Sequence, residues 1–181
     1  MKVLKFGGTS VGSEKNIRQV ISILNDYSEK DNVIAVVSAV GGITNKLLKA
    51  GELAKIQNLK YVSVYEEIHS KHIELIKVLI PKNNDEIIND TITKLQSLKQ
   101  LLDGIYLIHE ISPSTTDKLS SYGELLSSQI IAEAMRHQKL DAQVKNSQEL
   151  IITDDTHTKA EVNYALTNKN IKSFFKNTSH K

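Results

Sequence analysis

Cysteine is absent from the 181-residue sequence, and glycine and proline are scarce, with eight and two residues. Without cysteine the chain forms no disulfide and has neither a thiol nucleophile nor a thiolate metal site. It also lacks an apolar run of the ~18 residues that indicate a membrane-spanning helix. The sequence enters a strand-like apolar run at Val3, without the pattern of a signal peptide. These absences predict a cytoplasmic protein.

An excess of charge of either sign is absent as well. Lysine and arginine together number 23 and aspartate and glutamate 21, which gives a formal net charge of +2 at pH 7. Long basic runs, which would favour a nucleic acid or an acidic membrane as partner, do not occur. We therefore expect neither partner. The length is sufficient for one domain with a sizeable core.

The most informative stretch of the sequence is Lys2–Ser13, which reads KVLKFGGTSVGS. A short apolar run is followed at once by Gly7 and Gly8, and Ser13 then begins a helical pattern. A strand that ends at two glycines before a helix leaves backbone N–H groups free to bind an anion, most often phosphate. Lys5 lies on the strand, where its ammonium can reach the same phosphates. An ordinary strand–turn–helix unit would show the same pattern, so this stretch alone leaves both interpretations open.

Two better-known phosphate-binding motifs do not fit this stretch. Gly7 and Gly12 have the spacing of P-loop glycines, but Ser13 and Glu14 follow where Lys and then Ser or Thr are required. The dinucleotide fingerprint needs G-x-G-x-x-G, which the segment GGTSVG does not match. The predicted anion site is therefore of neither kind.

A second glycine turn follows a second strand pattern. Apolar residues between Ile17 and Leu24 recur at helical spacing, and Val33–Val37 is then a continuous apolar run rich in β-branched residues. Such a run is typical of a strand that is covered on both faces, as in a parallel sheet. It ends at the sequence SAVGG, residues 38–42, before another helical pattern. Because ligands bind beyond the carboxyl ends of parallel strands, we expect the two turns to face one crevice.

The region 59–110 contains two long helical stripes of apolar residues, separated near Pro81. They predict a helical hairpin packed on one face or edge of the sheet. His69 and His72 have a spacing that could hold a metal ion. No third ligand completes the set, so we predict no metal site.

The region 111–181 begins with a hydroxyl-rich loop at Ile111–Thr116, broken by Pro113, and continues as a helical pattern. It carries Gly123, and because glycine costs about 1 kcal/mol inside a helix, Gly123 indicates either a helix start or a close approach by backbone or ligand. Glu124 lies beside leucines, so its carboxylate could lie near the sheet, but composition alone favours a solvated glutamate near a helix N-terminus. Residues 142–145 and 150–153 then predict two strands, before a closing helix through Val162–Phe175.

Three motifs together resemble the N-terminal motifs of aspartokinases. They are KFGGTSVG at Lys5–Gly12, VVSAVGGITN at Val36–Asn45 and SSYGELLSS at Ser120–Ser128. The resemblance covers nearly the whole chain and implies the α/β fold of the amino-acid kinase superfamily, a three-layer α/β/α sandwich with a mainly parallel sheet. The closing segment Asn163–Phe175 is similar to that of aspartokinases fused to a homoserine dehydrogenase.

The resemblance implies a phosphotransferase that uses ATP and Mg²⁺ to phosphorylate the β-carboxylate of L-aspartate, the first step toward lysine, threonine and methionine. On this sequence, Lys5 would be the catalytic residue that neutralises charge on the phosphates as the γ-phosphoryl group moves. L-Aspartate would be contacted by Thr44, and its ammonium would be held by Glu124. The other contacts with the nucleotide phosphates would come from Gly7, Gly8, Thr9, Ser10, Ser38, Gly41 and Gly42.

The sequence departs from the family in one respect. No Gly-Gly pair follows Gly42, whereas aspartokinases have a later Gly-Gly-Ser-Asp motif with a catalytic aspartate, and regulatory ACT domains beyond it. We therefore interpret residues 1–181 as the N-terminal portion of a kinase domain, incomplete at its C-terminal side. It would comprise a βαβ unit at 1–58, the hairpin at 59–110, and a substrate-binding helix, strands and closing helix at 111–181. We expect this portion to be inactive alone and the complete enzyme to be a homo-oligomer.

Two alternatives stay open. Glutamate 5-kinase, uridylate kinase and related enzymes share a Lys-x-Gly-Gly-Ser start, but they lack the segment that Ser121–Glu124 matches. In a different class, the chain could be a non-catalytic binding or regulatory module with the same fold. Titration with aspartate and with Mg-ATP would separate these possibilities.

Overall fold

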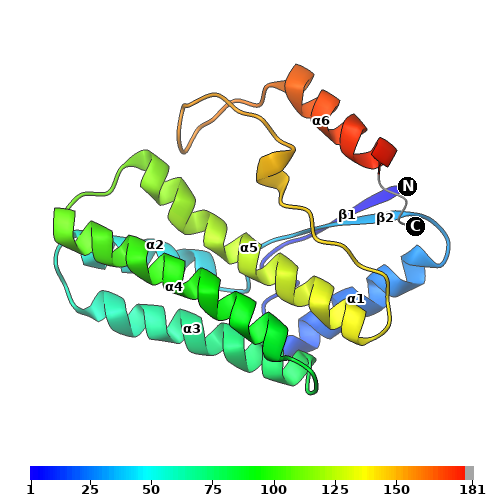
Figure 1. Ribbon diagram of the computed structural model, residues 1–181, viewed down its shortest axis with the longest axis horizontal. Coiled ribbons are helices and arrows are strands. Elements are labelled where there is room, and N and C mark those ends of the chain that lie inside the picture. The colour runs from blue at the N-terminus through cyan, green and yellow to red at the C-terminus, as the bar shows by residue number, and fades with distance from the viewer. Residues whose placement is uncertain (178–181) are drawn as a thin grey trace.

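A computed structural model describes residues 1–177, which form a two-stranded sheet and a larger helical body (Figure 1). No helix among these residues is both long enough and apolar enough to cross a membrane. In chain order the elements are β1 (Lys2–Phe6), α1 (Glu14–Ser28), β2 (Val33–Val37), α2 (Ile43–Lys55), α3 (Lys60–Leu79), α4 (Asp85–Ile108), α5 (Pro113–His137), the short 3₁₀ helix η1 (Ser147–Glu149) and α6 (Tyr164–Asn177).

The two strands are parallel, and α1 connects them. Their register pairs Lys2 with Val33 at one end and Phe6 with Val37 at the other. The backbone N–H of Ser38 also donates to the carbonyl oxygen of Phe6 at 3.1 Å, one residue beyond the strand pairing. The predicted βαβ unit is therefore confirmed, and both strands end side by side.

The helix α1 begins where the sequence predicted. Ser13 has an extended backbone, and its hydroxyl accepts a hydrogen bond from the N–H of Asn16 at 3.3 Å, which caps the helix. The buried residues of the helix are Ile17, Val20, Ile21 and Leu24. This is the apolar face that the helical spacing indicated, so local sequence is sufficient to define the helix.

The sheet is covered on one face. Leu4 and Phe6 of β1 and Val37 of β2 pack against the core, and β2 contacts α1 and α5. The opposite face carries Val3, which is 63% exposed, and Val36, which is 48% exposed. The prediction that β2 is covered on both faces is wrong for the described residues, because their helices pack against a single face. The α/β class with a parallel sheet is confirmed.

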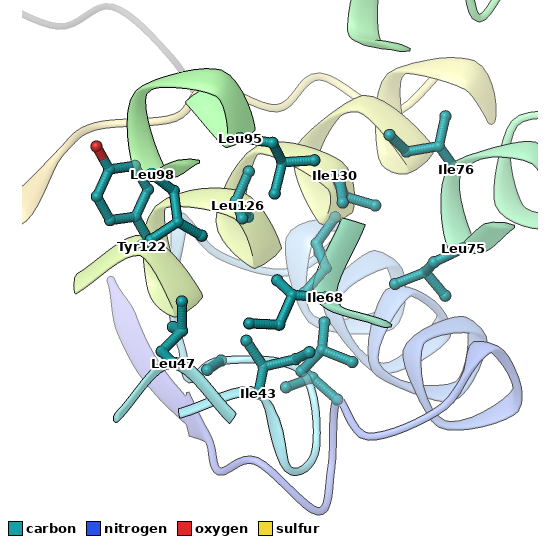
Figure 2. Packing of buried hydrophobic residues seen from close by; sticks show 14 of the residues in the cluster. Ile43, Leu47, Ile68, Leu75, Ile76, Leu95, Leu98, Tyr122, Leu126 and Ile130 are labelled. Carbon is teal, nitrogen blue, oxygen red and sulfur yellow. The ribbon is translucent and has the colours of Figure 1, made fainter. Parts of the chain in front are cut away.

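The helices α3 and α4 form the predicted hairpin, with α3 ending just before Pro81. The hairpin packs against α2 and α5 rather than against a face or edge of the sheet, which corrects the prediction of where it docks. The core shown in Figure 2 explains this placement, because apolar side chains of four helices meet there. Its labelled members include Ile43 and Leu47 of α2, Ile68 and Ile76 of α3, Leu95 and Leu98 of α4, and Leu126 and Ile130 of α5.

One of the two histidines of α3, His72, bonds within its own helix. His72 is fully buried, and its Nδ1 lies 2.7 Å from the carbonyl oxygen of Ile68, to which it donates within the helix. Burial lowers the pKa of His72, because the charged imidazolium would lose its hydration. No group of three or more potential metal ligands lies together in the described part of the chain.

The structure of residues 138–163 differs from the sequence prediction, which placed two further strands there. Neither 142–145 nor 150–153 forms a strand; only an isolated antiparallel bridge joins Thr153 to Val162. Val144 and Ile151 are 37% and 43% exposed, so the apolar pattern is present without a neighbouring strand to pair with. A short apolar run forms a strand only when a partner supplies its hydrogen bonds. The closing helix, α6, begins at Tyr164.

The helix α5 begins at Pro113, so the loop predicted over Ile111–Thr116 is wrong from Pro113 onward: Ser112 caps the helix, and proline suits its first position. Gly123 lies ten residues further, in the interior of α5, so the helix-start interpretation is wrong as well. A Cβ atom added at Gly123 would lie 2.6 Å from the Cβ of Ala39. Real side-chain atoms do not approach so closely, so glycine is required for α5 to pass the end of β2. The predicted close approach is confirmed, and the neighbour is Ala39, whose Cα also lies 3.7 Å from the added Cβ.

We expect Gly123→Ala to lower the free energy of unfolding by about 1–3 kcal/mol, because the added methyl group overpacks the contact with Ala39. Gly104→Ala in α4 is the matched control, since nothing lies within 4 Å of its added Cβ. That substitution should instead raise stability by about 0.5–1 kcal/mol through helix propensity. Urea unfolding of both variants measures the difference. Equal changes in the two would contradict the close approach.

Candidate functional site

The two glycine turns meet at the carboxyl ends of β1 and β2. A Cβ atom added at Gly41 would lie 3.0 Å from the Cα of Gly12 and 3.4 Å from the carbonyl oxygen of Gly8. One added at Gly12 would lie 3.1 Å from that same oxygen. The backbones of the two turns are thus in contact, and neither glycine has room for a side chain. The two turns therefore meet, as expected, whereas a crevice that both of them line stays a prediction.

The first turn closes on its own carbonyl groups. The N–H groups of Ser10 and Val11 donate to the carbonyl oxygen of Gly7, and that of Gly12 donates to Thr9. The side-chain amide of Asn16 also donates to the carbonyl oxygen of Thr9 at 2.7 Å, which ties the turn to α1. Within residues 1–177, the N–H groups of Gly8 and Thr9 have no acceptor. They are available to an anion.

The second turn leads into a helix that has no side-chain cap. Gly42 is the N-cap of α2 with φ at +80°, a left-handed conformation that favours glycine, and it cannot supply a capping oxygen. The N–H groups of Gly41 and Gly42 have no acceptor among the described residues. By contrast, the hydroxyl of Ser13 caps α1. The open positive helix end at this corner therefore belongs to α2 rather than to the first helix.

Glu124 reaches the second turn from α5. Its Oε1 accepts a hydrogen bond from the N–H of Ala39 at 3.2 Å, and the residue is half-buried. One turn further along α5, the hydroxyl of Ser127 donates to the carbonyl oxygen of Ser38 at 2.7 Å. The interpretation of Glu124 as a solvated glutamate near a helix start is therefore wrong. The carboxylate lies against the turn because the close approach at Gly123 brings the helix there.

The remaining candidates lie around this corner with fewer contacts. Thr44 is half-buried in the first turn of α2, and Thr9 and Ser10 are exposed. Lys5 is exposed on β1, in register with Val36 on the open face of the sheet. Its ammonium makes no hydrogen bond or ion pair with any described residue. The structure thus brings Glu124 and the two turns together, whereas the Lys5 side chain forms no hydrogen bond or ion pair with the described residues of either turn.

Two surface hollows bear on the site to different extents. A hollow of about 360 Å³ lies beside the first turn, lined by Phe6, Thr9, Ser10, Asn16, Gln19, Val20 and Ile23. A larger one of about 530 Å³ lies between the middle of α1 and the C-terminal ends of α3 and α5, near Arg18 and His137, and no candidate residue lines it. The smaller hollow therefore borders the first turn, and the larger lies away from the candidate residues.

Two supporting residues were not predicted from sequence. Ser127 fixes the carbonyl group of Ser38, and Asn16 fixes that of Thr9. Ser127 is the residue three positions after Glu124, so helical spacing places it on the same side of α5. That spacing is the sequence signal from which the position of Ser127 near the site could have been predicted. Asn16 offers none, because asparagine in the first turn of a helix is common for other reasons.

Comparison with known proteins identifies the family. The model of the amino acid kinase family matches residues 1–178. The chain belongs to this family. Aspartokinase 1 of Arabidopsis thaliana chloroplasts is 36% identical over 164 residues, which cover 88% of this chain and 28% of that protein. The bifunctional aspartokinase/homoserine dehydrogenase of Buchnera aphidicola is 27% identical over 99% of this chain and 22% of its own.

A solved structure agrees with this family assignment. Aspartokinase III of E. coli, in complex with aspartate and ADP, superposes with a TM-score of 0.85 at 25% identity. The match covers 96% of this chain and 37% of that one. The amino acid kinase fold is thus shown for this chain, which spans well under half the length of the aspartokinases that it matches.

We expect Ser127→Ala to lower the free energy of unfolding by about 1–3 kcal/mol, because it leaves the carbonyl group of Ser38 without its partner. Ser128→Ala is the control, since the hydroxyl of Ser128 bonds only within α5, to the carbonyl oxygen of Leu125. That change should be nearly neutral. Urea unfolding measures the free energy of unfolding of both variants. If Ser127→Ala leaves it unchanged, the hydrogen bond from Ser127 to Ser38 does not hold α5 to the turn.

Proposed function

We propose that this chain carries the amino-acid and phosphate contacts of an aspartate kinase, which transfers the γ-phosphate of ATP to the β-carboxylate of L-aspartate. One observation supports the proposal above others. The carboxylate of Glu124 is held 3.2 Å from the N–H of Ala39, in the turn that leads to the uncapped N-terminus of α2. A negative group and a cluster of free N–H groups therefore lie at one corner. The first suits the ammonium group of L-aspartate, and the second suits the phosphates of ATP.

The free N–H groups suit phosphate oxygens. Gly8 and Thr9 contribute from the first turn, and Gly41 and Gly42 from the second. Thr9, Ser10 and Ser38 would add hydroxyl groups. Gly7 would add an accessible backbone, since a Cβ atom placed there would have nothing within 4 Å. The described residues hold no cluster of acidic ligands for Mg²⁺, so the ion would be held by the phosphates it accompanies. Mg²⁺ would neutralise phosphate charge there.

The amino acid would lie between Glu124 and the start of α2. Glu124 would bind its ammonium group, and Thr44 would donate to one of its carboxylates. The β-carboxylate of aspartate is itself the nucleophile, so the protein needs no nucleophilic or basic residue for this step. Phosphoryl transfer to such a group depends on alignment and on charge neutralisation. Lys5 would supply part of that neutralisation from the end of β1.

We expect Glu124→Gln to weaken L-aspartate binding strongly, because it removes the charge that pairs with the ammonium group. The loss of a partly desolvated charge pair costs about 2–5 kcal/mol. Glutamine keeps an oxygen for the N–H of Ala39, so the fold should be retained. Isothermal titration of the chain with L-aspartate measures the effect. Succinate, which lacks the amino group, should bind weakly and should respond less to the substitution.

The control for this prediction is Glu133→Gln on the same helix, where the glutamate is paired with Arg136 on the surface. It should leave aspartate affinity unchanged. The proposal is wrong if the wild-type chain does not bind aspartate, or if Glu124→Gln and Glu133→Gln have equal effects.

We expect Lys5→Ala to weaken the binding of inorganic tripolyphosphate by about tenfold or more, as befits the loss of a hydrogen bond to a charged group. L-Aspartate affinity should change little. Lys5→Arg should not restore binding, because a planar guanidinium does not replace a compact ammonium. Lys15→Ala, which removes an exposed lysine of α1, controls for net charge. Titration at low salt tests this, and equal losses in Lys5→Ala and Lys15→Ala would assign Lys5 no specific role.

A further inference from the structure

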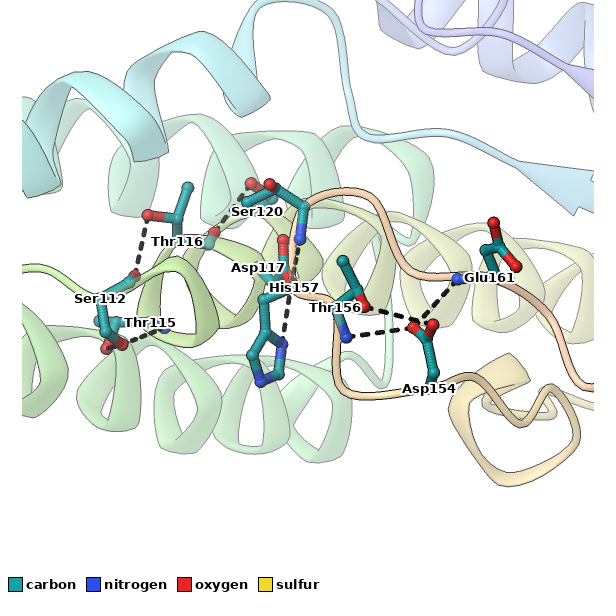
Figure 3. A network of polar contacts seen from close by, with 10 residues as sticks. Ser112, Thr115, Thr116, Asp117, Ser120, Asp154, Thr156, His157 and Glu161 are labelled. Atoms are coloured by element: carbon teal, nitrogen blue, oxygen red, sulfur yellow. Dashed lines mark hydrogen bonds and ion pairs between the residues drawn. The ribbon is translucent and has the colours of Figure 1, made fainter.

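The segment between Thr153 and Val162 is a closed loop. An isolated antiparallel bridge pairs these two residues, and the N–H of Asp154 donates to the carbonyl oxygen of Glu161 at 3.0 Å. Oδ1 of Asp154 in turn accepts from the N–H groups of Thr156 and Glu161, each at 3.1 Å. These backbone hydrogen bonds hold the pKa of Asp154 below its usual value. The 154–161 loop therefore has an internal structure of its own (Figure 3).

The tip of the 154–161 loop is attached to α5 through one side chain. Oδ2 of Asp117 accepts a hydrogen bond from the N–H of Thr158 at 2.9 Å and lies 3.2 Å from Nδ1 of His157. Figure 3 shows the loop passing over α5 at this point. Within residues 1–177, no other hydrogen bond or ion pair joins the loop to α5. All eight residues of the loop are exposed, so no buried apolar side chain holds it in place.

The backbone at the attachment point is strained. Thr158 has φ at +66°, a conformation that costs free energy for a β-branched residue. Such a conformation persists where surrounding contacts impose it. The hydrogen bond to Asp117 is the contact that the structure provides from outside the loop.

Asp117 and Glu124 lie on the same side of α5. They are seven residues apart, which is two helical turns and about 10 Å along the axis. Ser120 and Ser121 occupy the turn between them. Asp117 faces the 154–161 loop, and Glu124 faces the second glycine turn through Ala39. The loop and the second turn thus border one side of the helix.

We propose that Asp117 is a positioning residue for the amino-acid site, holding the 154–161 loop against the side of α5 that carries Glu124. The inference rests on the proposed function, because it assigns the loop as a wall of the site at which an acidic amino acid binds. A loop fixed in this way limits water at the site and reduces the conformational freedom that the ligand must remove on binding. Asp117 acts through the loop and need not touch the ligand itself.

The first experiment tests the attachment by limited proteolysis. Trypsin cleaves after lysine, and Lys159 lies in the loop. Asp117→Ala should increase the rate of cleavage after Lys159 by about tenfold, as expected for the loss of a hydrogen bond to a charged group. Asp117→Asn retains an acceptor for the N–H of Thr158 and should give an intermediate rate. Asp85→Ala removes an exposed aspartate from the first turn of α4 and should have no effect.

The second experiment tests the link to the ligand. Isothermal titration should show that Asp117→Ala weakens L-aspartate binding by about fivefold to tenfold, within the range for one charged hydrogen bond. Tripolyphosphate affinity should stay unchanged, and Asp117→Asn should recover part of the aspartate affinity. Saturating L-aspartate should slow cleavage after Lys159 in the wild-type chain and much less in Asp117→Ala. Circular dichroism and urea unfolding establish that each variant is folded.

The outcomes separate this inference from the proposed function. Faster cleavage of Asp117→Ala with unaltered aspartate affinity would make the contact purely structural and overturn the inference. Unchanged cleavage would mean that Asp117 does not hold the loop in solution, which overturns it as well. In both cases the proposed function would still be supported if Glu124→Gln bound L-aspartate more weakly than the wild-type chain. A wild-type chain that binds no aspartate would overturn both.

Discussion

The site depends first on a contact between two stretches of backbone. Two adjacent parallel strands end side by side, so the turns that follow them must share the same small volume. Gly12 and Gly41 make this possible, because a Cβ atom at Gly41 would lie only 3.0 Å from the Cα of Gly12. The same lack of side chains leaves N–H groups of Gly8 and Gly42 uncovered. Close packing requires glycine at Gly12 and Gly41, and the glycines of both turns leave backbone N–H groups that no side chain covers.

A long helix completes the corner. The helix α5 passes the end of β2 at Gly123, where any side chain would collide with Ala39. Glu124 and Ser127 then bond to the backbone of the second turn, one as acceptor and one as donor. A carboxylate carried on a helix and bonded in this way has few accessible positions. Such restriction is what a binding group needs if it is to meet a ligand without reordering.

One face of the sheet is open in the described part of the chain. Its described residues have helices packed on one face, while Val3 and Val36 are exposed on the other, and Lys5 shares that open face. The likeness to E. coli aspartokinase III covers 96% of this chain but 37% of the other. The family and fold are therefore supported along nearly the whole of this chain, and the relative contains a large part to which this chain has no counterpart.

Sequence alone determined the elements whose signals are local: the helices α1, α2, α3 and α4, both strands, and the glycine turns. Helical spacing, β-branched runs and turn residues each operate within a few positions, so they do not need the rest of the chain. Tertiary structure decided what depends on distant partners. Glu124 meets Ala39 across 85 positions, and Asp117 meets Thr158 across 41. Residues 142–145 have the composition of a strand but no partner strand among the described residues. The hairpin docks on helices rather than on the sheet, because an apolar stripe indicates that a helix face is buried but not which surface buries it.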